Sequence, residues 1–224
     1  GAVVRAHRWN GLDGWARHGL QDTPAALPEY PLTLPLSPVG RGFPDTLEYD
    51  RLVGLGVFDE DERIELLDSQ LMVREPQGSR HGVAIELADS ALRAALGPGW
   101  RVRVQLPIAL DEGSEPEPDL SVVAGDPRDG RHQHPARPAL IIEVAESTLA
   151  LDRDVKGPLF ARAGVPEYWI VNLVSETLEV HRDPMREPAT GMWRHASVRV
   201  LHAGGEATML AAPAARIRVA DLLP

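Results

Sequence analysis

The sequence contains no cysteine, which excludes disulfide bonds and metal sites built on thiolates. This composition fits a reducing compartment, so we expect a cytoplasmic protein. No apolar run approaches the roughly 20 residues that a membrane-spanning helix needs. The first residues also lack the apolar segment that is typical of a secretory signal. We therefore expect no membrane partner.

Positive charge is scarce as well, since the formal net charge is −10. A protein that coats nucleic acid normally has a basic face, so this charge argues against that class. An enzyme whose acidic site holds metal ions is not excluded, because bound cations reverse the local charge. The chain of 224 residues, 43% hydrophobic and 25% charged, is long enough for one large globular domain.

Lysine is almost absent, and Lys156 is the only one among 23 Lys and Arg residues. Where positive charge is enough, this chain uses arginine. A single retained lysine therefore indicates a need for a compact ammonium group in a tight pocket. The alternative is a chance survivor on a solvated helix face.

The first 44 residues contain prolines at 24, 28, 31, 35, 38 and 44, which forbid long regular structure. We expect either an extended arm on the body of the protein, anchored by Trp9 and Trp15, or partial disorder. The folded domain is expected at residues 45–224.

Hydrophobic periodicity in residues 45–224 predicts helices mixed with strands, hence an α/β fold. Helices are expected at about 45–52, 80–96 and 149–163, and strands at 63–67, 70–73, 100–110, 119–123, 140–142, 168–171, 177–182 and 193–201. The helix at 80–96 is expected to follow a Ser79 cap and to bury a stripe of apolar side chains, namely Val83, Leu87, Ala91 and Ala94. We expect the acids of 111–117 to form a solvated loop.

Three acids, Glu65, Asp119 and Glu143, stand at strand ends or in the predicted hairpin. Glu143 is expected to end the apolar run 140–142, where a buried carboxylate is costly unless a cation or strong donors meet it. Asp119 opens another apolar strand, and adjacent antiparallel strands could bring both carboxylates to one metal ion. Mg²⁺ prefers oxygen ligands, often one or two carboxylates together with phosphate and water.

Several short motifs occur together in this chain: Pro118-Asp119-Leu120, Ile142-Glu143-Val144, Ser147-Thr148, Asp152-Arg153, Lys156 and the run from 163 to 172. In this combination they resemble the Uma-type family of restriction endonucleases, which belongs to the PD-(D/E)xK nuclease superfamily. The resemblance covers about residues 45–185. Upstream, Glu65-Leu66-Leu67-Asp68 is similar to the family's E-L-I-D-G hairpin, and His81 matches its recurrent histidine.

The resemblance implies a restriction-endonuclease-like mixed β-sheet flanked by helices, with the Pro-rich arm in front of it. It also implies a nuclease dependent on Mg²⁺ or Mn²⁺, with DNA as the expected substrate. Asp119, Glu143 and the Val144 carbonyl would bind the metal, and Glu65 would be an additional acid of the site. Lys156 would be the catalytic lysine, placed on the helix because position 145 is alanine.

The sequence departs from the family pattern at four positions, none of which removes a ligand. Ser69 replaces the usual turn glycine, Ala145 a common serine, and Gly157 and Phe160 replace leucine and tyrosine. The first departure should make the turn costlier, and the others could loosen the site.

Simpler interpretations remain open for individual residues. Glu65 could instead pair with Arg63 or Arg74. Asp152 could form a helical ion pair with Lys156, four residues further on.

Histidines have simpler interpretations too. His81 could have a structural role, capping its helix or bonding across the site, rather than act as a base. His132 and His134 look like a ligand pair, but in a Gly- and Pro-flanked loop we expect them to be solvated.

At the level of the whole protein, two alternatives to a nuclease remain. One is an inactive nuclease-like module for binding or assembly, and the other is a hydrolase of another phosphoester. For an acidic chain to grip a duplex, we expect a homodimer that frames a basic groove with Arg101 and Arg103.

Overall fold

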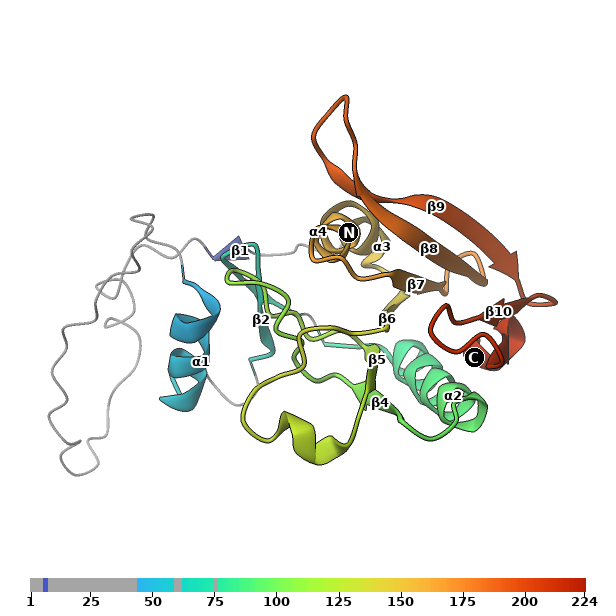
Figure 1. Cartoon of the computed structure of the whole chain (residues 1–224), viewed down its shortest axis with the longest axis horizontal. Coiled ribbons are helices and arrows are strands. Elements are labelled where there is room, and N and C mark those ends of the chain that lie inside the picture. The colour runs from blue at the N-terminus through green and yellow to red at the C-terminus, as the bar shows by residue number, and fades with distance from the viewer. Residues whose placement is uncertain (1–5, 8–43, 59–61, 75) are drawn as a thin grey trace, which may run out of the picture.

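The computed structural model describes residues 6–7, 44–58, 62–74 and 76–224 (Figure 1). The predicted arm at 1–44, including Trp9 and Trp15, therefore lies almost entirely outside the described residues. One short piece of it, β1 (Ala6–His7), pairs antiparallel with β3 (Gln70–Val73).

Six strands form the main sheet in the order β4-β5-β6-β7-β8-β9. These strands span Trp100–Val104, Leu120–Ala124, Leu140–Ala145, Glu167–Asn172, Thr177–Arg186 and Trp193–His202. All neighbouring pairs are antiparallel except β6 and β7, which run parallel. A parallel pair needs a crossover connection, formed here by α3 (Leu149–Leu151), η3 (Asp152–Lys156) and α4 (Gly157–Arg162). The predicted mixed sheet flanked by helices is confirmed.

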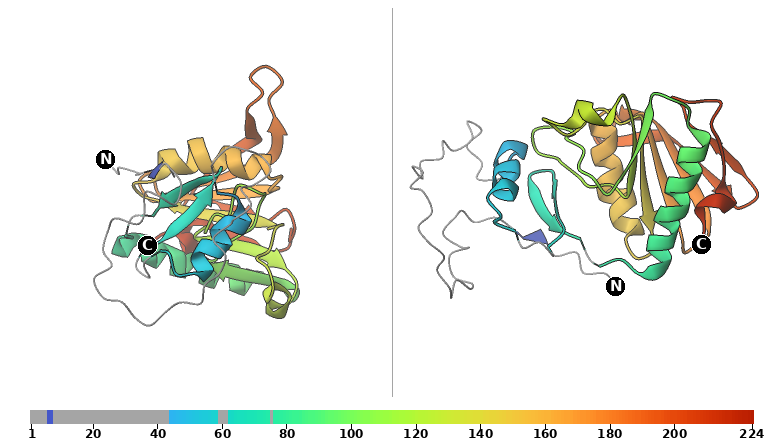
Figure 2. Two further views of the ribbon diagram at one scale, coloured as in Figure 1. Left: turned by 90° about the vertical axis from the view of Figure 1, so that its left-hand side faces the viewer. Right: turned by 90° about the horizontal axis from the view of Figure 1, so that it is seen from below.

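Both faces of the main sheet are covered (Figure 2). One face packs against α2 (Ser79–Ala95) and a C-terminal unit of β10 (Glu206–Thr208), β11 (Arg216–Arg218) and η4 (Val219–Leu222). The crossover helices cover the other face.

Strand β6 contributes to both hydrophobic cores because its side chains alternate between the two faces. Ile142 and Val144 belong to the core beneath α2. Ile141 and Ala145 belong to the core beneath α4. Glu143 shares the second face, so the strand directs its carboxylate toward the crossover helices.

A smaller unit beside the main sheet consists of α1 (Thr46–Gly54), β2 (Ile64–Leu67), β3 and β1. Helix α1 begins with a capping box, in which the Glu48 backbone N–H donates to Asp45 Oδ1 at 2.9 Å and the Asp45 N–H donates to Glu48 Oε2 at 3.4 Å. Between β2 and β3, Asp68 and Ser69 both adopt positive φ, 51° and 60°. Ser69 thus holds the left-handed conformation in which glycine would carry less strain.

Helix α2 departs from its prediction in two details. It follows Gly78, whose position leaves Ser79 inside the first turn. Its buried stripe lies one position further along than predicted, and consists of Ala84, Ile85, Ala88 and Leu92. Val83 is 41% exposed. Apolar residues occupy two adjacent stripes of this helix, and packing against the sheet selects one of them.

The strand predicted at 100–110 is also too long, because β4 ends at Val104. Gln105 has a φ of 49°, and its backbone N–H donates to the Asp119 carbonyl at 3.0 Å. The chain therefore turns away from the sheet, although Ile108 beyond the turn is still buried. No helix within the described ranges combines the length and apolar character that a membrane span requires.

Candidate active site

Two neighbouring strands bring Asp119 and Glu143 together. In the antiparallel register of β5 and β6, Leu120 lies opposite Ile142. The backbone N–H of Asp119 donates to Glu143 Oε2 at 3.3 Å, and the N–H of Val144 donates to Asp119 Oδ2 at 2.9 Å. Both acids are buried. Glu143 does not end its strand as predicted, because β6 continues to Ala145.

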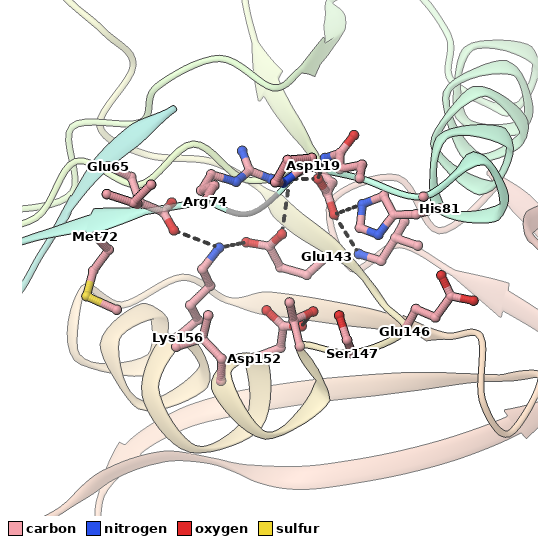
Figure 3. Close-up of a pocket in the computed structure, with 17 residues that line it drawn as sticks. Glu65, Met72, Arg74, His81, Asp119, Glu143, Glu146, Ser147, Asp152 and Lys156 are labelled. Carbon is pink, nitrogen blue, oxygen red and sulfur yellow. Dashed lines mark hydrogen bonds and ion pairs between the residues drawn. The ribbon is translucent and has the colours of Figure 1, made fainter. Parts of the chain in front are cut away.

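Lys156 extends from η3, a turn of π-helix, and places its ammonium group between two carboxylates (Figure 3). Its Nζ atom lies 2.9 Å from Glu143 Oε1 and 3.2 Å from Glu65 Oε1. With 3% exposure, Lys156 is not on a solvated helix face, so that interpretation is wrong. Burial alone would lower the pKa of Lys156, but Glu143 and Glu65 raise it above its ordinary value and keep the ammonium charged.

Glu65 reaches the site from β2. One oxygen contacts Lys156, and Oε2 accepts the backbone N–H of Glu117 at 3.1 Å. The ion pair that Glu65 forms among the described residues is thus with Lys156, and not with Arg63 or Arg74. Its carboxylate fixes the ammonium group from the side opposite Glu143.

Asp119 is surrounded by cationic and polar donors. Arg74 Nη2 lies 2.9 Å from Asp119 Oδ1, and His81 Nε2 lies 3.1 Å from Oδ2 without the alignment of a hydrogen bond. The amide of Gln77 donates to Oδ1 at 3.3 Å. Burial alone would raise the pKa of Asp119, but His81, Arg74 and the Val144 N–H together hold it well below its usual range. Asp119 therefore stays ionised.

Glu143 has the opposite electrostatic setting. Burial raises the pKa of Glu143 above its ordinary value, although Lys156 opposes the shift, and the negative charge of Asp119 adds to it. One ammonium group thus does not fully compensate these carboxylates. Further positive charge beside Glu143 would favour its ionised form.

A cavity of about 100 Å³ connects these groups. Its walls include Glu65, Asp119, Glu143, Val144 and Lys156, which are all of the predicted site residues. The cavity offers carboxylate oxygens, the donors that a hard divalent cation prefers. These residues therefore fit an Mg²⁺ or Mn²⁺ ion, with Asp119 and Glu143 as the candidate ligands.

Asp152 also lines the cavity, but not in the way that its spacing predicts. Its carboxylate accepts a hydrogen bond from the Thr148 hydroxyl at 2.8 Å. Within the described part of the chain, the ion pairs of Lys156 are with Glu143 and Glu65, so the predicted helical pair is wrong. Burial raises the pKa of Asp152 to about 6, with Lys156 opposing the shift.

Two departures from the family pattern, Gly157 and Phe160, lie in α4, and the packing around them is tight. Phe160 is fully buried, and its ring stands edge-on to Tyr168 with 4.9 Å between the centroids. Gly157 lies so close to Asp152 that a Cβ atom there would be 3.3 Å from the Asp152 carbonyl oxygen. Neither residue lines the cavity.

Sequence reasoning missed part of this site. The sequence patterns indicated Arg74 only as an alternative partner of Glu65, and they did not indicate Gln77 or Glu146 as site residues. All three line the cavity. No local pattern distinguishes them from surface residues, because their partners lie far away in the sequence.

Solvation was predicted for two loops outside the cavity, and the structure confirms it at some positions only. His132 is exposed, as predicted. Its ring accepts a hydrogen bond from the neighbouring Arg131. His134 instead lies 3.5 Å from Glu115. Glu115 is 2% exposed, so the prediction of a solvated acidic loop at 111–117 is wrong at this position.

Comparisons with known proteins identify the family of the chain and agree with its fold. Residues 47–217 match the model of the Uma2 family, described as "Putative restriction endonuclease". The crystal structure of a putative nuclease belonging to DUF820 from Anabaena variabilis ATCC 29413 is similar in fold, with a TM-score of 0.59 and 15% sequence identity over 75% of this chain and 94% of that chain. No curated protein matches the chain. The family match extends over most of the sequence, and the chain therefore belongs to the Uma2 family of putative restriction endonucleases.

Proposed function

We propose that this protein is a metal-dependent endonuclease that hydrolyses phosphodiester bonds, with DNA as its substrate. The observation that carries the proposal is the cavity that the only lysine of the chain shares with Glu65, Asp119 and Glu143. Membership of a nuclease family supports the same reaction class. An inactive binding module would have no need to keep an ammonium group buried between two carboxylates.

Each residue has a distinct part in the proposed reaction. Asp119 and Glu143, with the Val144 carbonyl, would hold Mg²⁺ or Mn²⁺, which would polarise the phosphate and lower the pKa of the attacking water. Lys156 orients that water or donates a hydrogen bond to charge that develops on the phosphate. Glu65 positions the Lys156 ammonium group through their 3.2 Å contact.

Arg74 and His81 act through Asp119 rather than on the substrate. Both lie about a hydrogen-bond length from its carboxylate, at 2.9 Å and 3.1 Å. They keep Asp119 ionised and fix its orientation, which is the usual work of groups behind a metal ligand.

A cleavage assay separates this proposal from its alternatives. Purified protein would be incubated with plasmid, single-stranded DNA and RNA, each with Mg²⁺, with Mn²⁺ and with a chelator. Metal-dependent cleavage of the DNA substrates is the expected result. Binding without cleavage would favour the inactive module, and hydrolysis of only small phosphodiesters would favour a different hydrolase.

Magnesium binding should depend on the two strand carboxylates. We expect calorimetry to detect weak Mg²⁺ binding that is lost in Asp119→Ala and in Glu143→Ala, because each removes a charged oxygen ligand. His132→Ala is the control, since its exposed imidazole lies outside the cavity. Unchanged binding in Glu143→Ala would refute the assignment of the ligands.

We also propose a homodimer as the form that grips DNA. Arg101 and Arg103 lie on one face of β4, an edge strand of the main sheet. The Nε atoms of both side chains are buried without a hydrogen-bond partner among the described residues. Burial and the neighbouring Arg101 lower the pKa of Arg103, as expected where two guanidinium groups are close. Light scattering at micromolar concentration should give twice the mass of one chain, and a monomer mass would contradict the proposal.

A further inference from the structure

Glu115 is a buried acid that the proposed nuclease mechanism does not use. Its exposure is 2%, and no lysine or arginine among the described residues forms an ion pair with its carboxylate. His134 Nε2 lies 3.5 Å from Glu115 Oε1. Burying a carboxylate is costly unless it is paired, so this position favours a bound cation.

Two further side chains turn toward Glu115 from distant parts of the chain. Asp50 comes from α1 and His134 from the loop after β5. Potential ligand atoms of Asp50, Glu115 and His134 all lie within 4.8 Å of one another. Glu115 forms the buried floor, and His134, 42% exposed, lies at the rim, where an ion can enter.

The protonation states around this cluster also suit a metal ion. Burial raises the pKa of Glu115 to about 7, and the negative charges of Asp50 and Glu117 add to the shift. A divalent ion would remove this electrostatic cost. Burial and the charge of Arg103 lower the pKa of His134, so its imidazole stays neutral, which is the form that binds metals.

We infer that Asp50, Glu115 and His134 bind a divalent transition-metal ion of the Zn²⁺ class, at a site separate from the nuclease cavity. Two carboxylate oxygens and one imidazole nitrogen would supply three ligands, and water the fourth. The imidazole favours Zn²⁺ over Mg²⁺, which prefers an all-oxygen shell. None of the three residues lines the nuclease cavity.

The position of the cluster indicates a structural role for the bound ion. The backbone N–H of Glu115 donates to the Leu66 carbonyl in β2 at 2.8 Å. Two residues later, the N–H of Glu117 donates to the Glu65 side chain. An ion at Glu115 would therefore join α1 and the His134 loop to the segment that holds Glu65 in place.

The test measures Zn²⁺ binding and thermal stability of the full chain, with Co²⁺ as a spectroscopic probe. We expect visible Co²⁺ absorption bands of a nitrogen-containing site, and a rise in melting temperature of about 5–10 °C at a Zn²⁺ concentration 100-fold above Kd. His134→Ala and the isosteric Glu115→Gln should abolish both effects. Asp119→Asn should leave them intact, which separates this site from the nuclease cavity.

His132→Ala is the matched control, because His132 lies in the same loop but outside the cluster. It should keep the Co²⁺ spectrum and the stabilisation by Zn²⁺. Equal Zn²⁺ effects in wild type and His134→Ala would overturn the inference. A wild type that Zn²⁺ does not stabilise would also overturn it. If Glu115→Gln is then more stable than wild type, the cluster is only a buried carboxylate without a ligand.

Discussion

Replacing Lys156 by arginine is expected to lower the rate of DNA cleavage about 10²–10³-fold, the usual effect of losing one well-placed donor in the transition state. The ammonium group fits between Glu143 and Glu65 at 2.9 Å and 3.2 Å, in a site with 3% exposure. A guanidinium group keeps the charge but is broader and disperses it, so it cannot take the same position. Single-turnover cleavage with Mg²⁺ measures the effect.

The control for this substitution is Arg162→Lys, also in the crossover helices. Arg162 is 36% exposed and pairs with Asp68 and Asp111. Exchange at an exposed pair changes stability by less than about 1 kcal/mol, and activity should not change. Lys156→Arg adds volume to a packed site and should cost about 1–3 kcal/mol of unfolding free energy, measured with denaturant. Full activity in Lys156→Arg would mean that positive charge alone is enough.

Replacing Arg182 by methionine is expected to destabilise the fold by about 3–5 kcal/mol, because it leaves a buried acid without its cation. Glu167 is fully buried at the start of β7, and Arg182 Nη2 lies 2.6 Å from its Oε1. The same carboxylate also accepts the Trp169 indole N–H at 2.9 Å and the Leu210 N–H at 2.7 Å. Denaturant unfolding measures the loss.

A matched control lies in the same β8–β9 hairpin. Arg194 pairs with Glu187 at 3.1 Å, but these side chains are 45% and 36% exposed. Arg194→Met should therefore cost less than about 1 kcal/mol. Comparable losses in Arg182→Met and Arg194→Met would show that burial of Glu167 does not set the energy of its ion pair.

Local sequence patterns predicted those parts of the fold where apolar residues dominate. The apolar stretches of β5, β6 and β7 are confirmed as buried strands. β4 is shorter than its alternation suggests, because Gln105 adopts a positive φ of 49° that turns the chain out of the sheet. Hydrophobic periodicity does not indicate where a residue other than glycine takes this conformation.

The placement of the acids also depends on residues that lie far away in the sequence. Glu143 was predicted to end the apolar run 140–142 and, where buried, to need a cation or strong donors. The structure places it within β6, where Lys156 and the Asp119 N–H meet its oxygens. The burial of Glu115 was missed because it accompanies a backbone hydrogen bond to Leu66 in β2, which forms only when the chain is folded.

The π-helical turn Asp152–Lys156 has a consequence for how the chain tolerates changes in length. Its i→i+5 bond, from the Gly157 N–H to the Asp152 carbonyl, accommodates one more residue than an α-helical turn would. Val155 is 44% exposed, so its side chain contributes little to the core. Deleting this one residue would close the turn to α-helical geometry, because a π-helical turn holds one extra residue without changing the register of the helix on either side. Asp152 and Lys156 would then stay on nearly the same face of the helix. Loss of one residue here should therefore disturb the cavity less than loss of a residue from a regular helical turn.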